Sequence, residues 1–133
     1  MKLVRGLGVI AASVALAFGM STESFAANFT MYTTDGDPGG RAQFTKYGDV
    51  FTVCDLEEDG WAVSGFVYKA NSGDIAIPIY SIHAGGKGNC STAAASDGGA
   101  HDLPESRDYK FQVCLYHGSE AAYCRNDLWY NNA

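Results

Sequence analysis

Short segments of alternating apolar and polar residues run through most of the chain and limit its fold more than any other feature. Val50–Asp55 reads VFTVCD, and Tyr109–His117 reads YKFQVCLYH with Phe111, Val113 and Leu115 on one parity. This alternation predicts half-buried β-strands, because successive side chains of a strand point to opposite faces. No segment repeats its apolar residues with a helical period over a useful length. The sequence therefore predicts an all-β protein.

Further β signals lie between turns rich in Gly, Asp and Asn. They predict strands at Arg41–Lys46, Trp61–Lys69, Ile75–Ile82, Cys90–Ala95 and Ala121–Arg125. Asp59-Gly60 predicts a hairpin between the strands on either side of it. The change of apolar parity at Gly65 predicts a bulge or local bend. Pro78 cannot donate to a ladder, which predicts an edge strand or a bulge there.

The cysteines indicate two disulfides. The four are Cys54, Cys90, Cys114 and Cys124. An even number in a small exported domain is typical of a disulfide framework, and three pairings are open. We favour Cys54–Cys90 with Cys114–Cys124, because the second pair would clamp one hairpin and the first would join distant segments. In the chain-entropy model these loops are worth about 4 and about 3 kcal/mol respectively.

The start of the chain has the pattern of a secretory signal peptide. Lys2 and Arg5 precede an apolar run, Leu7–Met20, and Ser24-Phe25-Ala26 places small residues at the cleavage positions. An uncleaved membrane anchor is the alternative. We therefore divide the chain into a signal peptide (1–26), an N-terminal extended strand with a flexible linker (27–40) and a β-sandwich domain (41–133). We expect an extracellular protein with no membrane attachment after cleavage.

Domain size and strand number favour one architecture. Many short strands and two disulfides in about 100 residues are typical of an antiparallel immunoglobulin-like β-sandwich. Trp61 is expected to pack in its core beside a disulfide. The patch Leu128, Trp129 and Tyr130 either covers the open end of the sandwich or forms a binding patch, and we favour covering.

Charge excludes one class of partner. Without residues 1–26 the chain keeps seven Lys and Arg against fourteen Asp and Glu, a net charge of −7. Such a chain repels polyanions, and its basic residues form no stripe. Nucleic-acid binding is therefore not expected.

No catalytic, cofactor or metal site is predicted. The histidines are His83, His101 and His117, and no nucleophile motif accompanies them. A hydrolase would need an acid–base pair such as His101 with Glu105. Asp35-Gly36-Asp37 begins like a calcium loop but lacks the later ligands, and Leu56–Asp59 is interpreted as a solvated acidic turn. Zinc is not expected, because the chain has no CxxC or HxxxH pair. We therefore expect a non-enzymatic protein.

The segment Phe29–Thr34 has two open interpretations. Phe29 and Met31 alternate like the inward face of a strand, and Asp35–Gly40 separates that strand from the rest. It is either an ordinary first strand of its own sheet or an arm that completes a partner's sheet by β-augmentation. On the second interpretation the partner-binding residues are Phe29, Thr30, Met31, Tyr32, Thr33 and Thr34.

Four stretches carry a resemblance to a known family: GGRAQFTKYGDVFTVCDLEEDGWAVSGFVY, GNCSTA, DLPESRDYKFQVCLYH and YCRNDLW. They resemble small secreted two-disulfide β-sandwich proteins of filamentous actinomycetes, some of which are similar to the adaptor subunit of umbrella toxin particles. Those particles are extracellular antibacterial complexes. The resemblance implies that the chain joins a lectin-like subunit to the stalk of the large toxin subunit. It also implies that the N-terminal segment takes part in docking.

Two other function classes remain open. Enediyne-carrying apoproteins are also small acidic two-disulfide sandwiches, although their cysteines are spaced differently. Secreted protease inhibitors need a rigid loop braced by a disulfide, and residues Cys90–Asp108 could supply one. The chain is therefore either an adaptor or, as alternatives, a small-ligand carrier or a protease inhibitor.

Overall fold

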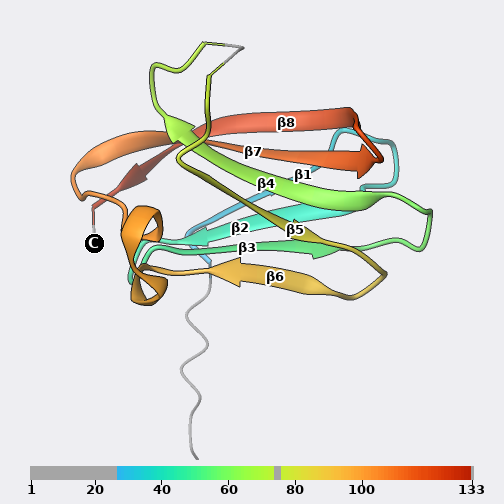
Figure 1. The fold of residues 1–133 in the computed structure, drawn as a ribbon, viewed down its shortest axis with the longest axis horizontal. Helices are drawn as coiled ribbons and strands as arrows, with labels where there is room; N and C mark the ends of the chain where they lie inside the picture. Colours follow the sequence, from blue (N-terminus) through green and yellow to red (C-terminus); the bar gives the residue numbers. More distant parts are fainter. Residues whose placement is uncertain (1–26, 74–75, 133) are drawn as a thin grey trace, which may run out of the picture.

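Two antiparallel four-stranded sheets pack face to face in the computed structural model, which describes residues 27–73 and 76–132 (Figure 1). The first sheet contains, in spatial order, β1 (Phe29–Tyr32), β2 (Gly40–Thr45), β3 (Val50–Asp55) and β6 (Cys90–Ala93). The second sheet contains β5 (Tyr80–Ala84), β4 (Ala62–Lys69), β7 (Arg107–His117) and β8 (Glu120–Asn131). Two 3-10 turns, η1 (Ala95–Asp97) and η2 (Gly99–His101), connect β6 to β7. The predicted antiparallel all-β sandwich is confirmed.

The order of the strands does not confirm the immunoglobulin-like topology. Immunoglobulin domains place their first two strands beside their fourth and fifth, whereas here β1, β2 and β3 are neighbours in one sheet. The hairpin predicted at Asp59-Gly60 was wrong. Strand β3 pairs with β2 and β6, and β4 pairs with β5 and β7, so residues 56–61 cross from one sheet to the other. A turn signal is local and does not state which strands pair.

Aromatic rings from both sheets fill the core. The ring of Phe111 on β7 lies 4.6 Å from that of Phe44 and 5.2 Å from that of Phe51, measured between centroids. Trp129 on β8 closes this cluster at 4.6 Å from Phe111 and is 3% exposed. Of the C-terminal patch that was expected to cover the core, only Trp129 does so, because Leu128 and Tyr130 are 54% and 43% exposed. Trp61 is only partly buried, and its ring lies 5.3 Å from the imidazole of His117.

Gly65 does not mark a bulge, which corrects the prediction from parity. Strand β4 keeps continuous register through this residue, opposite Ile82 of β5 and Val113 of β7. A Cβ at Gly65 would lie 2.5 Å from Cγ1 of Val53 on the facing sheet. Glycine is therefore needed because the two sheets approach closely, and the two parities are simply the two faces of the strand.

The strand predicted at Ile75–Ile82 begins later than expected. Strand β5 starts at Tyr80, after Pro78, and Ile77 is 91% exposed. Ile75 lies outside the described residues. The expectation of an edge strand is confirmed, because β5 is the outer strand of the second sheet. Alternation alone could not show that Ile77 lies outside the core.

Each disulfide joins two neighbouring strands of one sheet. Cys54 and Cys90 face each other across β3 and β6, and Cys114 and Cys124 join β7 to β8, with S–S distances of 2.03 Å. The favoured pairing is confirmed. Within the described residues no disulfide connects one sheet to the other.

A buried carboxylate ties the C-terminal strand to two loops. Asp49, in the turn between β2 and β3, is 1% exposed. It accepts hydrogen bonds of 2.8 Å from the backbone N–H of Leu103 and from the side-chain amide of Asn131. A buried carboxylate is tolerated when such donors satisfy it.

The proposed signal peptide, residues 1–26, lies outside the described residues. None of the described residues forms a helix long and apolar enough to cross a membrane.

Candidate functional site

The segment predicted to bind a partner lies at the edge of the chain's own first sheet. Strand β1 pairs antiparallel with β2, with Phe29 opposite Phe44 and Met31 opposite Ala42. Met31 is 2% exposed, and the Phe29 ring stacks on Trp129 with 5.2 Å between centroids. This is the arrangement of an ordinary first strand. The two side chains expected to fill a partner's pockets therefore pack within this molecule.

Hydrogen bonds close the segment that follows β1 into a defined loop. The N–H of Thr33 donates to the carbonyl of Gly40 at 3.0 Å, and the N–H of Gly39 donates to the Asp35 carboxylate at 2.9 Å. The N–H of Thr34 donates to the carbonyl of Tyr123 on β8 at 3.0 Å. Residues 35–40 were predicted to be a flexible linker; in the structure they form a hydrogen-bonded loop that ends at Gly40, the first residue of β2. The side chains of Thr30, Tyr32 and Thr34 remain exposed, and their contact with a partner stays a prediction.

Apolar side chains also gather on the outer face of the second sheet, away from the core. We call this surface the aromatic face, and it consists of Phe66, Tyr68, Tyr116, Leu128 and Tyr130. Because Val67 and Phe111 point into the core, their sequence neighbours on β4 and β7 point outward. Leu128 and Tyr130 extend the same surface onto β8, where they are 54% and 43% exposed.

Three rings of the aromatic face, those of Phe66, Tyr68 and Tyr116, lie close together on β4 and β7. Phe66 lies 6.1 Å from Tyr68 and 6.2 Å from Tyr116, measured between centroids. The Tyr68 hydroxyl donates to Gln112 at 3.3 Å, and the Lys110 ammonium lies 4.9 Å from the Tyr68 ring. Burial raises the pKa of Tyr68, and Tyr116 adds to this, so the hydroxyl remains a donor. These contacts hold the rings in a fixed arrangement.

A histidine and a serine lie beside the aromatic face, on β5 and β4 of the second sheet. The Ser64 hydroxyl on β4 lies 2.6 Å from Nδ1 of His83 on β5. Ser64 is 2% exposed, and within the described residues His83 contacts only Ser64 and the Phe66 ring. A Ser–His pair acts as a nucleophile and base when a third group orients the histidine and an oxyanion site faces the serine. We therefore interpret this pair as a cross-strand hydrogen bond.

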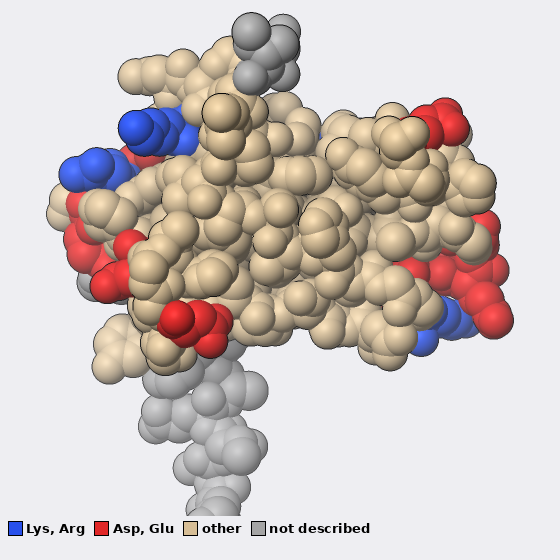
Figure 2. Space-filling view, viewed as in Figure 1, with Lys and Arg blue, Asp and Glu red and all other residues tan. Residues whose placement is uncertain are grey.

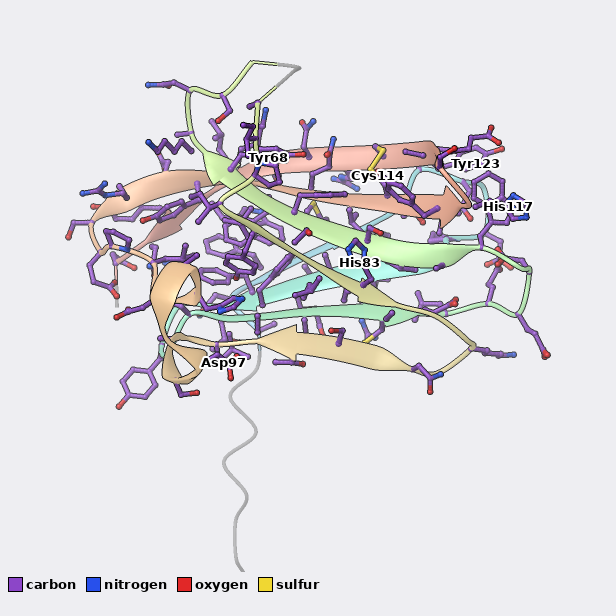
Figure 3. The ribbon with its side chains drawn as sticks, viewed as in Figure 1. Tyr68, His83, Asp97, Cys114, His117 and Tyr123 are labelled. Carbon is purple, nitrogen blue, oxygen red and sulfur yellow. A yellow bond between two sulfur atoms is a disulfide. The ribbon has the colours of Figure 1, made fainter. Side chains whose placement is uncertain are left out.

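The other two histidines are held by different neighbours. His101 packs against Tyr80 with 4.7 Å between centroids, and its Nδ1 lies 3.2 Å from the carbonyl of Gly98. His117 packs against Trp61. Figure 3 places His83 on β5 and His117 close to Tyr123, by the turn between β7 and β8, so the histidines do not share a site.

Two acidic loops meet at one end of the sandwich. A hydrogen bond with Asp37 raises the pKa of Glu57, and desolvation and the charges of Asp37, Asp59 and Asp35 add to the shift. Glu57 and Asp59 also line an open hollow of about 300 Å³. In the part of the chain that the structure describes, no group of three or more His, Cys, Asp or Glu side chains is arranged to hold a metal ion.

A larger hollow lies at another place on the surface. Its volume is about 830 Å³, and Lys69, Arg107 and Asp108 contribute to its lining. Sites for small organic ligands are mostly apolar and enclose the ligand, with few charged groups. In this hollow the three charged side chains share the lining with apolar ones, among them Ile79, Pro104 and Tyr109.

The charged residues are unevenly distributed over the visible face of the molecule. In Figure 2, Lys, Arg, Asp and Glu lie toward the two ends of the visible face, and the middle, over β4 and β5, is uncharged.

No family of known sequences, no curated protein and no solved structure matches the chain.

The aromatic face was missed from the sequence, although a signal for it was present. Phe66 and Tyr68 have the opposite parity to Val63 and Val67, and all four are apolar. A strand that is apolar on both faces, at the surface of a two-layer sandwich, must expose one of them. That parity was interpreted as a bend at Gly65.

Proposed function

We propose that this chain is an extracellular, non-enzymatic adaptor that binds other proteins through the aromatic face. The observation that carries the proposal is the set of five apolar side chains, Phe66, Tyr68, Tyr116, Leu128 and Tyr130, on the outer face of the second sheet. Gln112 and Lys110 on β7 lie between the rings on β4 and the two residues on β8, so the apolar side chains surround a polar strip. Exposed apolar side chains gathered on one face mark interaction sites, and aromatic residues are enriched in the centres of protein interfaces.

The rigidity of the second sheet supports this function. The Cys114–Cys124 disulfide joins the two strands that carry Tyr116, Leu128 and Tyr130, and the rings on β4 pack on their neighbours. A surface that is already ordered loses little side-chain entropy when a partner binds. The aromatic face is therefore suited to a stable, specific contact.

A second contact, at the edge of β1, would make the chain an adaptor. An exposed edge strand accepts an extended segment of another protein through backbone hydrogen bonds. The exposed side chains of Thr30, Tyr32 and Thr34 would lie beside such a segment. In this form the partner adds a strand to β1, whereas the donation of β1 would remove Met31 from the core. We propose a lectin-like subunit and a large toxin subunit as the two partners, following the family resemblance.

Affinity purification tests the proposal. The chain, expressed with a tag after residue 133 in its source organism, is recovered from the culture medium, and its partners are identified by mass spectrometry. We expect two large secreted proteins, one of them lectin-like. Recovery of the chain alone, of a protease or of a coloured small molecule would contradict the adaptor function.

Matched variants connect the partner to the surface. Phe66→Lys places a charge in the middle of the aromatic face, and Ile77→Lys makes the same change at a side chain that is 91% exposed elsewhere. We expect Phe66→Lys to lose one partner and Ile77→Lys to keep both, with equal circular dichroism spectra. Tyr116→Lys repeats the test if Phe66→Lys fails to fold. Equal partner recovery by all variants would show that the aromatic face is not the contact.

A further inference from the structure

Strand β8 is a long edge strand with an open side. It contains 12 residues, and in the described part of the chain its only neighbour in the sheet is β7. The pairing with β7 is regular from Arg125 to Asn131, and every residue from Tyr123 to Leu128 is exposed. An edge strand of this length is a template for pairing with another strand.

The loop after β1 limits how much of this edge is available. The N–H of Thr34 donates to the carbonyl of Tyr123, so the edge is occupied at that residue. At its other end the edge closes at Asn131, which is fully buried. The open stretch therefore runs from Cys124 to Tyr130.

Two opposite charges lie symmetrically on this open stretch. Arg125 and Asp127 flank Asn126, and because they are two residues apart their side chains leave the strand on the same side. Both are exposed, and within the described residues neither is in an ion pair. The Asp127 carboxylate accepts a hydrogen bond only from the N–H of Leu128, at 3.0 Å.

We propose that two copies of the chain associate through β8, paired antiparallel about a two-fold axis at Asn126. In this register Arg125 lies opposite Asp127 of the second copy, and the same ion pair repeats on the other side of the axis. Leu128, which is 54% exposed, lies opposite Cys124 of the second copy and covers its disulfide. The two second sheets join into one continuous sheet of eight strands.

The charges select this register and this partner. An axis at Arg125 would place two guanidinium groups opposite each other, and an axis at Asp127 would do the same with two carboxylates. Directly opposite residues of paired strands are about 5 Å apart, where opposite charges attract and like charges repel. Like charges placed opposite each other would repel a second copy, whereas Arg125 and Asp127 attract one in this register. A second copy is therefore the occupant that fits this edge.

The dimer does not depend on the proposed function. Pairing at the edge leaves the outer face of the second sheet open and presents two copies of the aromatic face on one surface. Two linked sites bind a multivalent partner more tightly than one site does. Since the paired stretch is short, we expect a weak dimer whose population rises with concentration.

Sedimentation equilibrium of the purified, disulfide-bonded chain tests the pairing. As the concentration rises to about 1 mM, the average mass should move from that of one chain toward that of two. Arg125→Asp and Asp127→Arg should each weaken association roughly tenfold. The double variant should restore the association, and so should an equimolar mixture of the two single variants. Lys87→Asp makes the same change of net charge on an exposed loop and should have no effect.

Two results would overturn the pairing. One is a single-chain mass at every concentration. The other is association that the single charge reversals do not change, or that neither the double variant nor the mixture restores. Circular dichroism and thermal unfolding of each variant show whether the fold is kept. Because the measurement uses one pure protein, its outcome is separate from the search for partners in the culture medium.

Discussion

At the residue scale, Gly65 sets how closely the two sheets approach. An added Cβ would lie 2.5 Å from Cγ1 of Val53 and 2.8 Å from two ring carbons of Phe51. Real Cβ atoms do not make contacts of this length, so the facing side chains would have to move. In a core of native density such movement forces side chains away from their preferred rotamers.

We therefore expect Gly65→Ala to destabilise the fold by about 1–3 kcal/mol. Urea unfolding followed by circular dichroism measures this loss. Gly36→Ala is the control, because a Cβ at Gly36 meets no atom within 4 Å. Equal stability of the two variants would show that the sheets are further apart than the structure has them.

Asp49 has a structural role that could not be predicted from its sequence neighbours. It lies in the turn Tyr47-Gly48-Asp49, which its sequence of Gly and Asp is sufficient to indicate. Its burial and its hydrogen bond to Asn131, 82 residues further along the chain, leave no local pattern. Propensity and periodicity report on near neighbours, whereas this carboxylate is placed by the packing of three distant segments.

At the element scale, β1 is part of the body of the protein. Met31→Ala should destabilise the fold by about 2–5 kcal/mol, because it removes a side chain that is 2% exposed and leaves a cavity. Tyr32→Ala, at a neighbouring side chain that is 41% exposed, should cost about 0.5 kcal/mol or less. Thermal unfolding of both variants checks the difference. A Met31→Ala protein as stable as wild type would mean that β1 is detachable after all.

The contact between the two acidic loops predicts how the stability of the fold changes with pH. A hydrogen bond between the carboxyl groups of Glu57 and Asp37 requires a proton on one of them, and it raises the pKa of Glu57. The folded protein therefore holds this proton more tightly than the unfolded chain does. The resulting stabilisation is present below the ordinary pKa of a glutamate and is lost as the pH rises through the raised value.

Glu57→Gln removes this titration together with the repulsion at neutral pH. We expect a higher Tm than wild type at pH 7 and a difference that closes as the pH falls below about 4. Glu58→Gln removes the same charge from a carboxylate that does not act on Glu57, and it should have a smaller effect. A lower Tm for Glu57→Gln at pH 7 would show that the loops attract each other by another means.

Regular alternation predicted the central strands correctly. Local signals failed for the features that depend on which strands pair with one another. Strand β3 has the bounds that its pattern predicts, and the inward residues of β7 are buried as expected. The aromatic face and the crossing at Asp59-Gly60 were missed, because both depend on which strands lie together. The opening strand fits either its own sheet or a partner's, so its pattern left that choice open.

At the scale of the whole molecule, the two disulfides differ in the length of chain they close. Cys54–Cys90 spans 36 residues and Cys114–Cys124 spans 10. The chain-entropy model gives about 4 and about 3 kcal/mol for the two loops. Each pair has one buried cysteine, Cys54 at 3% exposure and Cys114 at 2%. The packing lost when a pair is replaced by alanine is therefore comparable for the two disulfides.

Replacing both cysteines of a pair by alanine should therefore cost more at Cys54 and Cys90 than at Cys114 and Cys124. Urea unfolding of the two double variants gives the comparison, with wild type as the reference. A larger loss from the shorter loop would show that the disulfides act through the folded state rather than through the entropy of the unfolded chain.

The order of the crosslinks along the chain determines how the protein would respond to tension. Strands β1 and β2 precede Cys54, and the last part of β8 follows Cys124. A pull on both termini would separate these strands from the sheets first and would then act on the disulfide bonds. The enclosed stretches could not lengthen while those bonds remain, so the protein would stop extending far short of its contour length.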